Sequence, residues 1–271
     1  MYAGGSRGSC IGMFWVGTSG WQYRDWRGRF YPPGAPTASW LALYAGCFPI
    51  VEVNSTFYRL PERSTFQHWR DATDGTRLRF VLKCSRYLTH VRRLVAPQEP
   101  VGRLLDRAEP LGDRLVAVLV QLPPGLVADP PLLDGVLGAF AARGARVAFE
   151  PRDPSWLADE PRGVLTARDA ALVWTDRRGR IGALDRTASW GYVRFHEGRS
   201  REGAYGPAAL STWARRLAGC WPDPQAEVMA FFNNDHAAAA PRNAAMLARR
   251  LRALGRPAPG GGDRPRDRSD G

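Results

Sequence analysis

The chain has 271 residues, of which 44% are hydrophobic, and its 38 lysine and arginine residues outnumber the 26 acidic ones, giving a net charge of +12. This composition is typical of a globular protein with a substantial core, and no run of about 18 apolar residues exists that would span a membrane. The four cysteines are too scattered for a disulfide framework, and the first residues lack the apolar core of a secretory signal. We therefore expect a cytoplasmic protein.

Eight short runs of strand-forming residues recur along the chain, and most of them are separated by segments with helical spacing, such as residues 211–221 and 241–254. The runs are residues 14–16, 50–53, 79–82, 116–120, 147–149, 171–174, 192–195 and 228–232. Strands that alternate with helices in about 250 residues predict an α/β protein, a single (β/α)₈ TIM barrel. An open doubly wound sheet is the alternative, but residues 16–23 do not form the glycine-rich phosphate turn expected after its first strand.

The two ends of the chain differ in composition from the segment between them. We assign residues 1–12, which are rich in glycine and serine, to a flexible N-terminal extension. The barrel domain is predicted to cover residues 13–255. Residues 256–271 have no apolar periodicity, so we expect a disordered basic tail there.

Polar side chains follow the predicted strands, and the carboxyl ends of barrel strands form the catalytic face of this fold. In chain order these residues are Trp21, Glu52, Asn54, Lys83, Gln121, Glu150, Arg152, Asp176, Arg194, His196, Asn233, Asn234 and Asp235. Four pairs lie two positions apart, so each pair shares a strand face: Glu52 with Asn54, Glu150 with Arg152, Arg194 with His196, and Asn233 with Asp235. We expect them to point together into the mouth of the barrel. The alternative for any one of them is a satisfied ion pair in the barrel wall.

Lys83 is the only lysine in the chain, since every other basic residue counted above is arginine. An ammonium group is compact and can lose its proton, whereas a guanidinium group stays charged and presents a rigid fork. A site that needs a deprotonated amine cannot use arginine. The position of this lysine at the end of the third run therefore indicates that its side chain has a catalytic or binding role.

Several motifs together resemble the YecE-like family, TIM-barrel proteins known as domain of unknown function 72. The motifs are GTSGW at 17–21, E-x-N-S-T-F-Y at 52–58, F-E-x-R-x-x-S-W at 149–156, R-F-H at 194–196 and N-N-D at 233–235. The resemblance spans about residues 14 to 251 and implies a TIM barrel whose strand-end residues form a shared site. It implies no reaction. One departure is Glu197, which stands where the family pattern usually has glycine.

The sequence predicts an enzyme that acts, without a metal, on a small anionic, hydroxyl-rich molecule such as a phosphorylated or carboxylated sugar derivative. The predicted catalytic residues are Lys83, Glu150, His196 and Asp176. The predicted substrate-binding residues are Trp21, Glu52, Asn54, Tyr58, Gln121, Arg152, Arg194, Asn233, Asn234 and Asp235. In this hypothesis Arg152 and Arg194 clamp the anion, Glu150 or His196 moves a proton, and Lys83 polarises a carbonyl or forms a Schiff base.

Two other functions remain open at this stage. Glu150, Asp176, His196 and Asp235 could in principle gather a divalent metal, but neighbouring cationic side chains would repel it. The excess of arginine also permits a nucleic-acid-binding or processing protein, which we do not favour because the arginines are spread along the whole chain. The sequence gives no prediction of a cofactor or of the oligomeric state.

Overall fold

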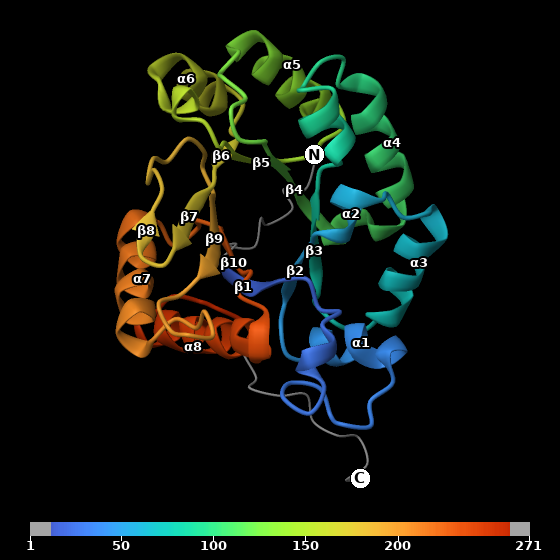
Figure 1. Ribbon diagram of the computed structural model, residues 1–271, viewed down its shortest axis with the longest axis vertical. Coiled ribbons are helices and arrows are strands. Elements are labelled where there is room, and N and C mark those ends of the chain that lie inside the picture. The colour runs from blue at the N-terminus through green and yellow to red at the C-terminus, as the bar shows by residue number, and fades with distance from the viewer. Residues whose placement is uncertain (1–11, 261–271) are drawn as a thin grey trace, which may run out of the picture.

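The computed structural model describes residues 12–260, in which a curled sheet is surrounded by helices (Figure 1). The strands are β1 (Phe14–Ser19), β2 (Ile50–Val53), β3 (Arg79–Lys83), β4 (Leu115–Gln121), β5 (Val147–Glu150), β6 (Ala171–Leu172), β7 (Trp174–Arg177), β8 (Arg180–Ile181), β9 (Gly191–Glu197) and β10 (Val228–Phe232). All eight predicted runs lie within this sheet. The run at 171–174 is the one that is divided, between β6 and β7, at Val173.

The ten strands form one sheet in the order β6-β5-β4-β3-β2-β1-β10-β9-β7-β8. Every neighbouring pair is parallel except β7 and β8, which form an antiparallel hairpin. β6 pairs with β5, and β7 pairs with β9. The observed sheet is thus mixed α/β and TIM-barrel-like, and it differs from the predicted barrel of eight uninterrupted strands at Val173 and by the extra strand β8.

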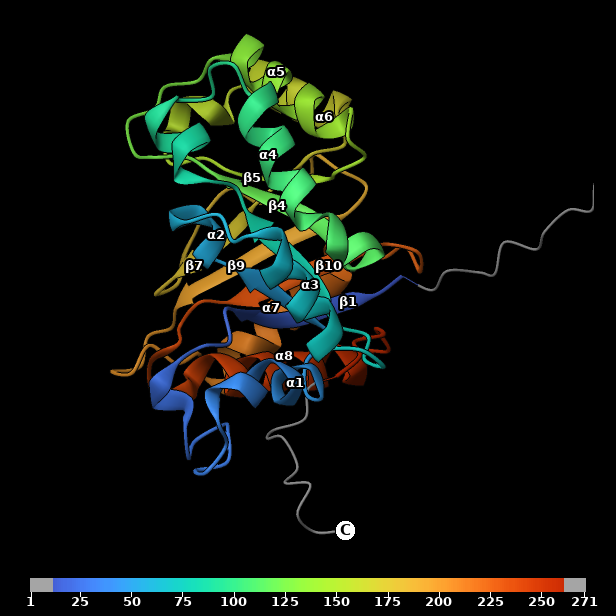
Figure 2. The ribbon, with the colours of Figure 1, turned by 90° about the vertical axis from the view of Figure 1, so that its right-hand side faces the viewer.

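With one exception, the helices pack around the outside of the sheet. They are α1 (Trp40–Ala45), α2 (Ser55–Tyr58), α3 (Arg63–Ala72), α4 (Gln98–Ala108), α5 (Pro130–Ala141), α6 (Asp159–Ala167), α7 (Pro207–Cys220) and α8 (Ala239–Ala253). The exception is the short α2, which lies against β3 at the end that bears Lys83 (Figure 1). Figure 2 shows the strands running between α4, α5 and α6 on one side and α1 and α8 on the other. None of the described helices is long and apolar enough to cross a membrane.

The connection after β7 departs from a regular (β/α)₈ pattern. None of residues 178–190 is helical, although the fold rule predicts a helix there. Arg178 and Gly179 both have positive φ angles and turn the chain directly into β8. Because this segment is short, polar and interrupted by such a turn, it forms a hairpin and a loop in place of a helix.

Two hydrophobic clusters separate the inner face of the sheet from its outer face. The inner cluster contains Trp15, Ile50, Val81, Ala117, Leu119, Ala148, Ala171, Val173, Trp190, Tyr192, Met229 and Phe231. Side chains on a strand alternate between faces, so residues two positions further along each strand share the inner face. By this rule the side chains of Glu52, Lys83 and Arg194 lie on the inner face. They follow the inner-facing residues Ile50, Val81 and Tyr192 by two positions. The carboxyl ends of the strands therefore hold a polar layer above an apolar one.

The opposite end of the curled sheet is closed by an ionic cluster around Glu227. Its carboxylate accepts hydrogen bonds from Trp15 Nε1 at 2.7 Å and from Arg146 NH2 at 2.7 Å. Arg79 NH1 lies 3.2 Å from the same carboxylate, and its guanidinium stacks on the Trp15 ring. These contacts satisfy the charge of Glu227, so the cluster joins residues at the amino ends of several strands.

The described parts of the two predicted flanks pack against the sheet. Phe14 N donates to Pro257 O at 2.8 Å, Ala258 is buried, and Arg252 NH1 donates to Ala258 O at 2.7 Å. Residues 256–260 are therefore part of the packed fold, because backbone hydrogen bonds hold them to β1 and α8. Gly12 is buried as well. Residues 1–11 and 261–271, which make up the rest of the predicted extension and tail, lie outside the described residues.

Candidate active site

Arg194 on β9 lies on the inner face between two buried carboxylates. Its NH1 donates to Glu150 Oε2 and its NH2 to Glu52 Oε1, both at 2.7 Å. Tyr192, two residues earlier, donates its hydroxyl to Glu52 Oε2 at 2.5 Å. All three charged side chains are at most 3% exposed. Because both terminal nitrogens are paired with carboxylates, Arg194 is not free to clamp an external anion, and the ion-pair alternative describes it better than our prediction did.

The charges in this cluster fix one another's protonation states. Burial alone would raise the pKa of Glu150, but the charge of Arg194, followed by contacts with His196, holds that pKa well below its ordinary value. Burial alone would lower the pKa of Arg194, but Glu52 and Glu150 hold it above its ordinary value. Glu150 is thus a carboxylate across the neutral range, and we do not expect it to carry a proton to a substrate.

Lys83 lies at the end of β3 and is 9% exposed. Its Nζ donates to Gln121 Oε1 at 2.7 Å and lies 4.2 Å from the centre of the Phe57 ring. Among the described residues no carboxylate forms an ion pair with this ammonium. Burial, followed by the charge of Arg194, lowers the pKa of Lys83 from 10.5 to about 8, although Glu52 acts in the opposite direction. A much larger fraction of this amine is therefore deprotonated near neutral pH than for an exposed lysine.

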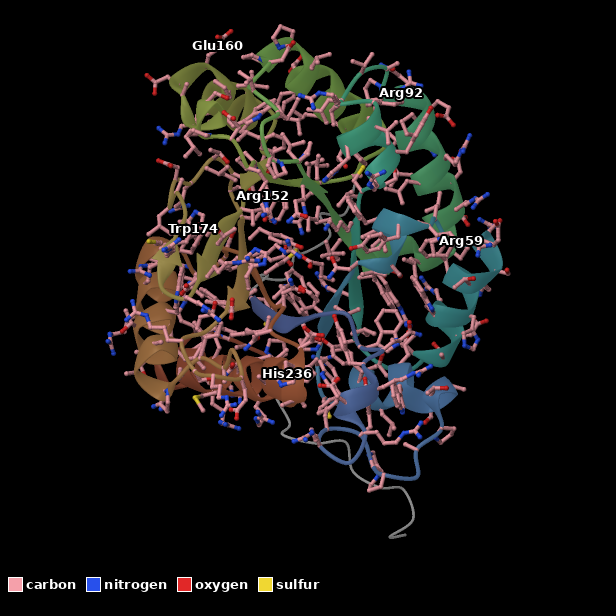
Figure 3. All side chains as sticks on the ribbon, viewed as in Figure 1. Arg59, Arg92, Arg152, Glu160, Trp174 and His236 are labelled. Atoms are coloured by element: carbon pink, nitrogen blue, oxygen red, sulfur yellow. The ribbon has the colours of Figure 1, made fainter. Side chains whose placement is uncertain are left out.

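Two further groups approach Glu150 from the open side of the site. His196 Nε2 lies 3.5 Å from Glu150 Oε1, and Arg152 NH2 lies 3.4 Å from the same oxygen. Asn233 Nδ2 lies 3.5 Å from His196 Nδ1. The His196 side chain is only 7% exposed, whereas that of Arg152 is 38% exposed and lies inside the ring of elements in Figure 3. Arg152 is the guanidinium of this group that an incoming anion can reach.

Three predicted residues lie around the rim. Asn54 is half-buried, and its Oδ1 has no hydrogen-bond partner among the described residues. Asp235 is half-buried too, and burial above all raises its pKa. Burial above all raises the pKa of Tyr23, and the charges of Asp235 and Glu52 add to that shift. Tyr58 is 80% exposed.

A known family matches most of the chain. The family model for Protein of unknown function DUF72 matches residues 15–266. This chain belongs to the DUF72 family. The match confirms the resemblance seen in the sequence motifs, and the description of the family assigns no activity to it.

Two solved structures share the fold of this DUF72 protein over most of its length, and one curated relative matches part of its sequence. A DUF72 family protein from Thermotoga maritima MSB8 is 25% identical and superposes with a TM-score of 0.73, covering 89% of this chain and 98% of that one. A DUF72 family protein from Enterococcus faecalis V583 is 19% identical, with a TM-score of 0.71 and coverage of 89% and 96%. The UPF0759 protein YunF of Bacillus subtilis (strain 168) is 27% identical over 118 residues, which are 41% of this chain and 40% of that relative. The aligned region therefore spans well under half of that curated relative.

Asp176 was predicted to be catalytic, and the DUF72 structure does not bring it into the site. Its carboxylate accepts hydrogen bonds from Trp213 Nε1 on α7 at 2.6 Å and from Gly179 N at 2.9 Å. The reason is strand alternation, because Val173 is on the inner face and Thr175 has the same parity, whereas Asp176 does not. Asp176 thus anchors α7 on the outer face.

Asn234 and Trp21, both predicted to bind substrate, also lie away from the site. Asn234 Nδ2 donates to Gly203 O and to Asn243 Oδ1, both at 2.9 Å, on the outer side of the sheet. The Trp21 ring is 4% exposed and packs edge-to-face on Trp69 of α3 at 5.3 Å. Both side chains hold loops and helices in place.

Four neighbours of the site were not among the predicted site residues. Tyr192 has the parity of Arg194, and this signal was available in the sequence. Phe57, from the E-x-N-S-T-F-Y motif, touches Lys83, and the His90 ring packs edge-to-face on Phe57 at 5.0 Å. Burial, then Arg86, Lys83 and Arg152 lower the pKa of His90. The remaining neighbour is Tyr23, whose hydroxyl donates to Ser19 O at 2.5 Å.

Among residues 12–260, no group of three or more histidine, cysteine or acidic side chains is arranged to hold a metal ion. The set of Glu150, Asp176, His196 and Asp235 considered from the sequence is not formed, because Asp176 faces α7. That the reaction needs no metal stays a prediction.

Proposed function

We propose that this DUF72 protein is an enzyme that binds a small anionic, hydroxyl-rich carbonyl compound and forms a Schiff base with it through Lys83, without a metal. The observation that carries the proposal is the state of Lys83. It is a mostly buried amine with a pKa lowered to about 8, held by a neutral amide and an aromatic face. Such an amine is nucleophilic near neutral pH, as in known Schiff-base lysines.

The surrounding groups suit the steps of imine formation. The Lys83 lone pair attacks the carbonyl carbon, so that a C–N bond forms while the C=O π bond breaks, and one proton passes from the nitrogen to the oxygen to give a carbinolamine. The C–O bond then breaks as the nitrogen lone pair forms the C=N bond, and the oxygen leaves as water with the second proton lost by the nitrogen. In the proposal His196, whose Nε2 lies 3.5 Å from Glu150 Oε1, moves these protons, because Glu150 stays ionised. Arg152 would bind the anionic part of the substrate.

Borohydride trapping with a matched pair of aldehydes tests this proposal. Glyceraldehyde 3-phosphate and glyceraldehyde would each be incubated with the protein, reduced, and the adduct on Lys83 quantified by peptide mass spectrometry. We expect half-maximal labelling by the phosphorylated aldehyde at a roughly tenfold lower concentration, because one charge-assisted hydrogen bond contributes about 1.5–3 kcal/mol.

The variant Arg152→Met is the control for the anion site. It should reduce the preference for the phosphorylated aldehyde while Lys83 remains labelled. Absence of any adduct on Lys83 across phosphorylated and carboxylated hydroxy-carbonyl compounds would contradict the proposed reaction. Equal labelling by the charged and uncharged aldehydes would contradict the anion site alone.

The proposal treats the fold as one domain with a closed (β/α)₈ barrel and therefore a single mouth. Val173 N donates to Phe149 O at 2.9 Å, which continues the pairing of β6 with β5 past the interruption. Residues 171–177 then act as a single sixth strand that joins β5 to β9. This pairing supports closure of the ring. The cytoplasmic location expected from the sequence remains part of the proposal.

The nucleic-acid alternative has less support. A nucleic-acid surface needs unpaired cations that extend beyond the mouth. Many described arginines are instead paired with acids on the same surface, as Arg143 is with Asp106 and Arg168 with Asp134. No contact among the described residues favours this function.

A further inference from the structure

We infer that Gln121 is a positioning residue that holds the Lys83 amine in place without giving it a counter-charge. This inference rests on the proposed function, since it explains how the site keeps its amine reactive. Gln121 stands between the amine and the nearest carboxylate in its hydrogen-bond chain, with Lys83 Nζ 2.7 Å from its Oε1 and Glu150 Oε1 2.8 Å from its Nε2.

The strand order makes this bridge possible. β4 lies between β3 and β5, and Gln121 is in register with Glu150 on the neighbouring strand. The side chains of Lys83 and Glu150 thus come from the two strands that flank Gln121. All three side chains are largely buried, so water competes little for these contacts.

The chemistry of the two neighbours fixes the orientation of the amide. The ionised Glu150 carboxylate only accepts hydrogen bonds, so the Gln121 NH₂ group must face it. The Gln121 oxygen must then face Lys83, which donates whether it is an ammonium or an amine. In the amine form one N–H still bonds to this oxygen, and the nitrogen lone pair is left for a carbonyl carbon.

A carboxylate at position 121 would change the amine's electrostatics. It would pair directly with the Lys83 ammonium, and an opposite charge at this distance shifts a pKa by about 1–3 units toward the charged form. The fraction of free amine below the pKa falls tenfold for each unit. Neutrality at position 121, and not merely a hydrogen bond, therefore preserves the low pKa that burial and Arg194 give to Lys83.

Two variants separate charge from folding. Gln121→Glu adds the carboxylate but also places it against Glu150. The double variant Gln121→Glu with Glu150→Gln exchanges the acid and the amide, so that the net charge is conserved and the amide at 150 can still donate to the acid at 121. The matched control is Gln225→Glu, the same chemical change at an exposed position near the amino end of β10.

The readout is the pH dependence of Lys83 methylation by formaldehyde and cyanoborohydride, followed on the Lys83 peptide by mass spectrometry. Because the chain has one lysine, the signal belongs to this residue. In both variants at position 121 we expect the pH midpoint of Lys83 methylation to rise by one unit or more. The methylation rate at pH 7 should then fall about tenfold or more. Gln225→Glu should follow the unmodified protein.

A folded exchange variant whose midpoint equals that of the unmodified protein would overturn the role of Gln121. A shift of the same size in Gln225→Glu would overturn it as well, because the effect would then be general electrostatics. This assay needs no substrate. The methylation assay can therefore support the role of Gln121 even if the aldehyde labelling contradicts Schiff-base formation. It can equally contradict the role of Gln121 while the aldehyde labelling supports Schiff-base formation.

Discussion

The variant Arg194→Met is expected to lose about 3–5 kcal/mol of unfolding free energy at pH 7, because it leaves two buried carboxylates without their shared counter-charge. Glu52 and Glu150 each receive one terminal nitrogen of this guanidinium at 2.7 Å. Methionine fills a similar volume, so the loss reports the charge more than a cavity. Urea unfolding followed by circular dichroism measures it.

The loss of unfolding free energy in Arg194→Met should decrease as the pH falls. The folded-state pKa of Glu150 is depressed, so its contribution to stability is present above the unfolded pKa and is lost as pH falls through the folded pKa. Without Arg194 the buried carboxyl is disfavoured as an anion and takes up a proton more readily. The deficit of Arg194→Met should therefore be largest at neutral pH and smaller at pH 4.

Arg59→Met is the matched control, since Arg59 is exposed and lies at the periphery in Figure 3. It should change stability by less than about 0.5 kcal/mol. A loss below about 1 kcal/mol in Arg194→Met, or a deficit that is the same at pH 7 and pH 4, would contradict a central ion cluster.

The variant Lys83→Arg is expected to abolish borohydride-trapped adducts, lowering the rate of labelling roughly 100-fold or more, because a guanidinium cannot act as a deprotonated amine nucleophile. The positive charge is kept, so attraction of an anionic substrate is not the variable. Labelling is measured with glyceraldehyde 3-phosphate on the intact protein, after urea unfolding has verified that the variant is folded.

Lys83→Met completes this test by removing the charge as well as the nucleophile. Both variants should lose adduct formation equally if the amine itself reacts. If folded Lys83→Arg still accumulates adduct at the rate of the unmodified protein, the reacting group lies elsewhere, and the lone lysine is only a consequence of the composition of the chain.

Much of the fold followed from the spacing of the apolar runs, because each run supplied a buried strand of the sheet. Strand-end position and, for three of them, inner-face parity also predicted that Glu52, Lys83, Glu150 and Arg194 would lie at one end, and hydrogen bonds through Gln121 and Arg194 join these side chains. These predictions succeeded because strand alternation is local: it depends on residues two positions apart and hardly on the rest of the chain.

The errors arose where the next polar residue was chosen without regard to parity. Asp176 is one position past the inner-facing Thr175, and Asn234 is one past Asn233, so both side chains turn toward the outer helices. The missing helix after β7 could not be predicted from periodicity, since the turn depends on the backbone of Arg178 and Gly179.

The sequence left open whether Arg194 is paired with acids or free to bind a ligand, and the structure pairs both of its terminal nitrogens while its Nε has no partner among the described residues. The motif identified Arg194 as a mouth residue, but its partners come from β2 and β5, which are far away in the chain. Only the three-dimensional arrangement distinguishes a buried guanidinium whose two terminal nitrogens are paired with carboxylates from a partly exposed one that can bind a ligand, as Arg152 can.

The account depends most on the protonation of Lys83, and NMR titration of protein labelled with ¹⁵N-lysine measures it directly, because the chain gives one lysine side-chain resonance. We predict a midpoint at about 8. Between that value and 10.5 the native protein then binds fewer protons than the unfolded chain, so this group makes stability rise with pH in that interval. A midpoint near 10.5, the ordinary value, would contradict a reactive amine at this site.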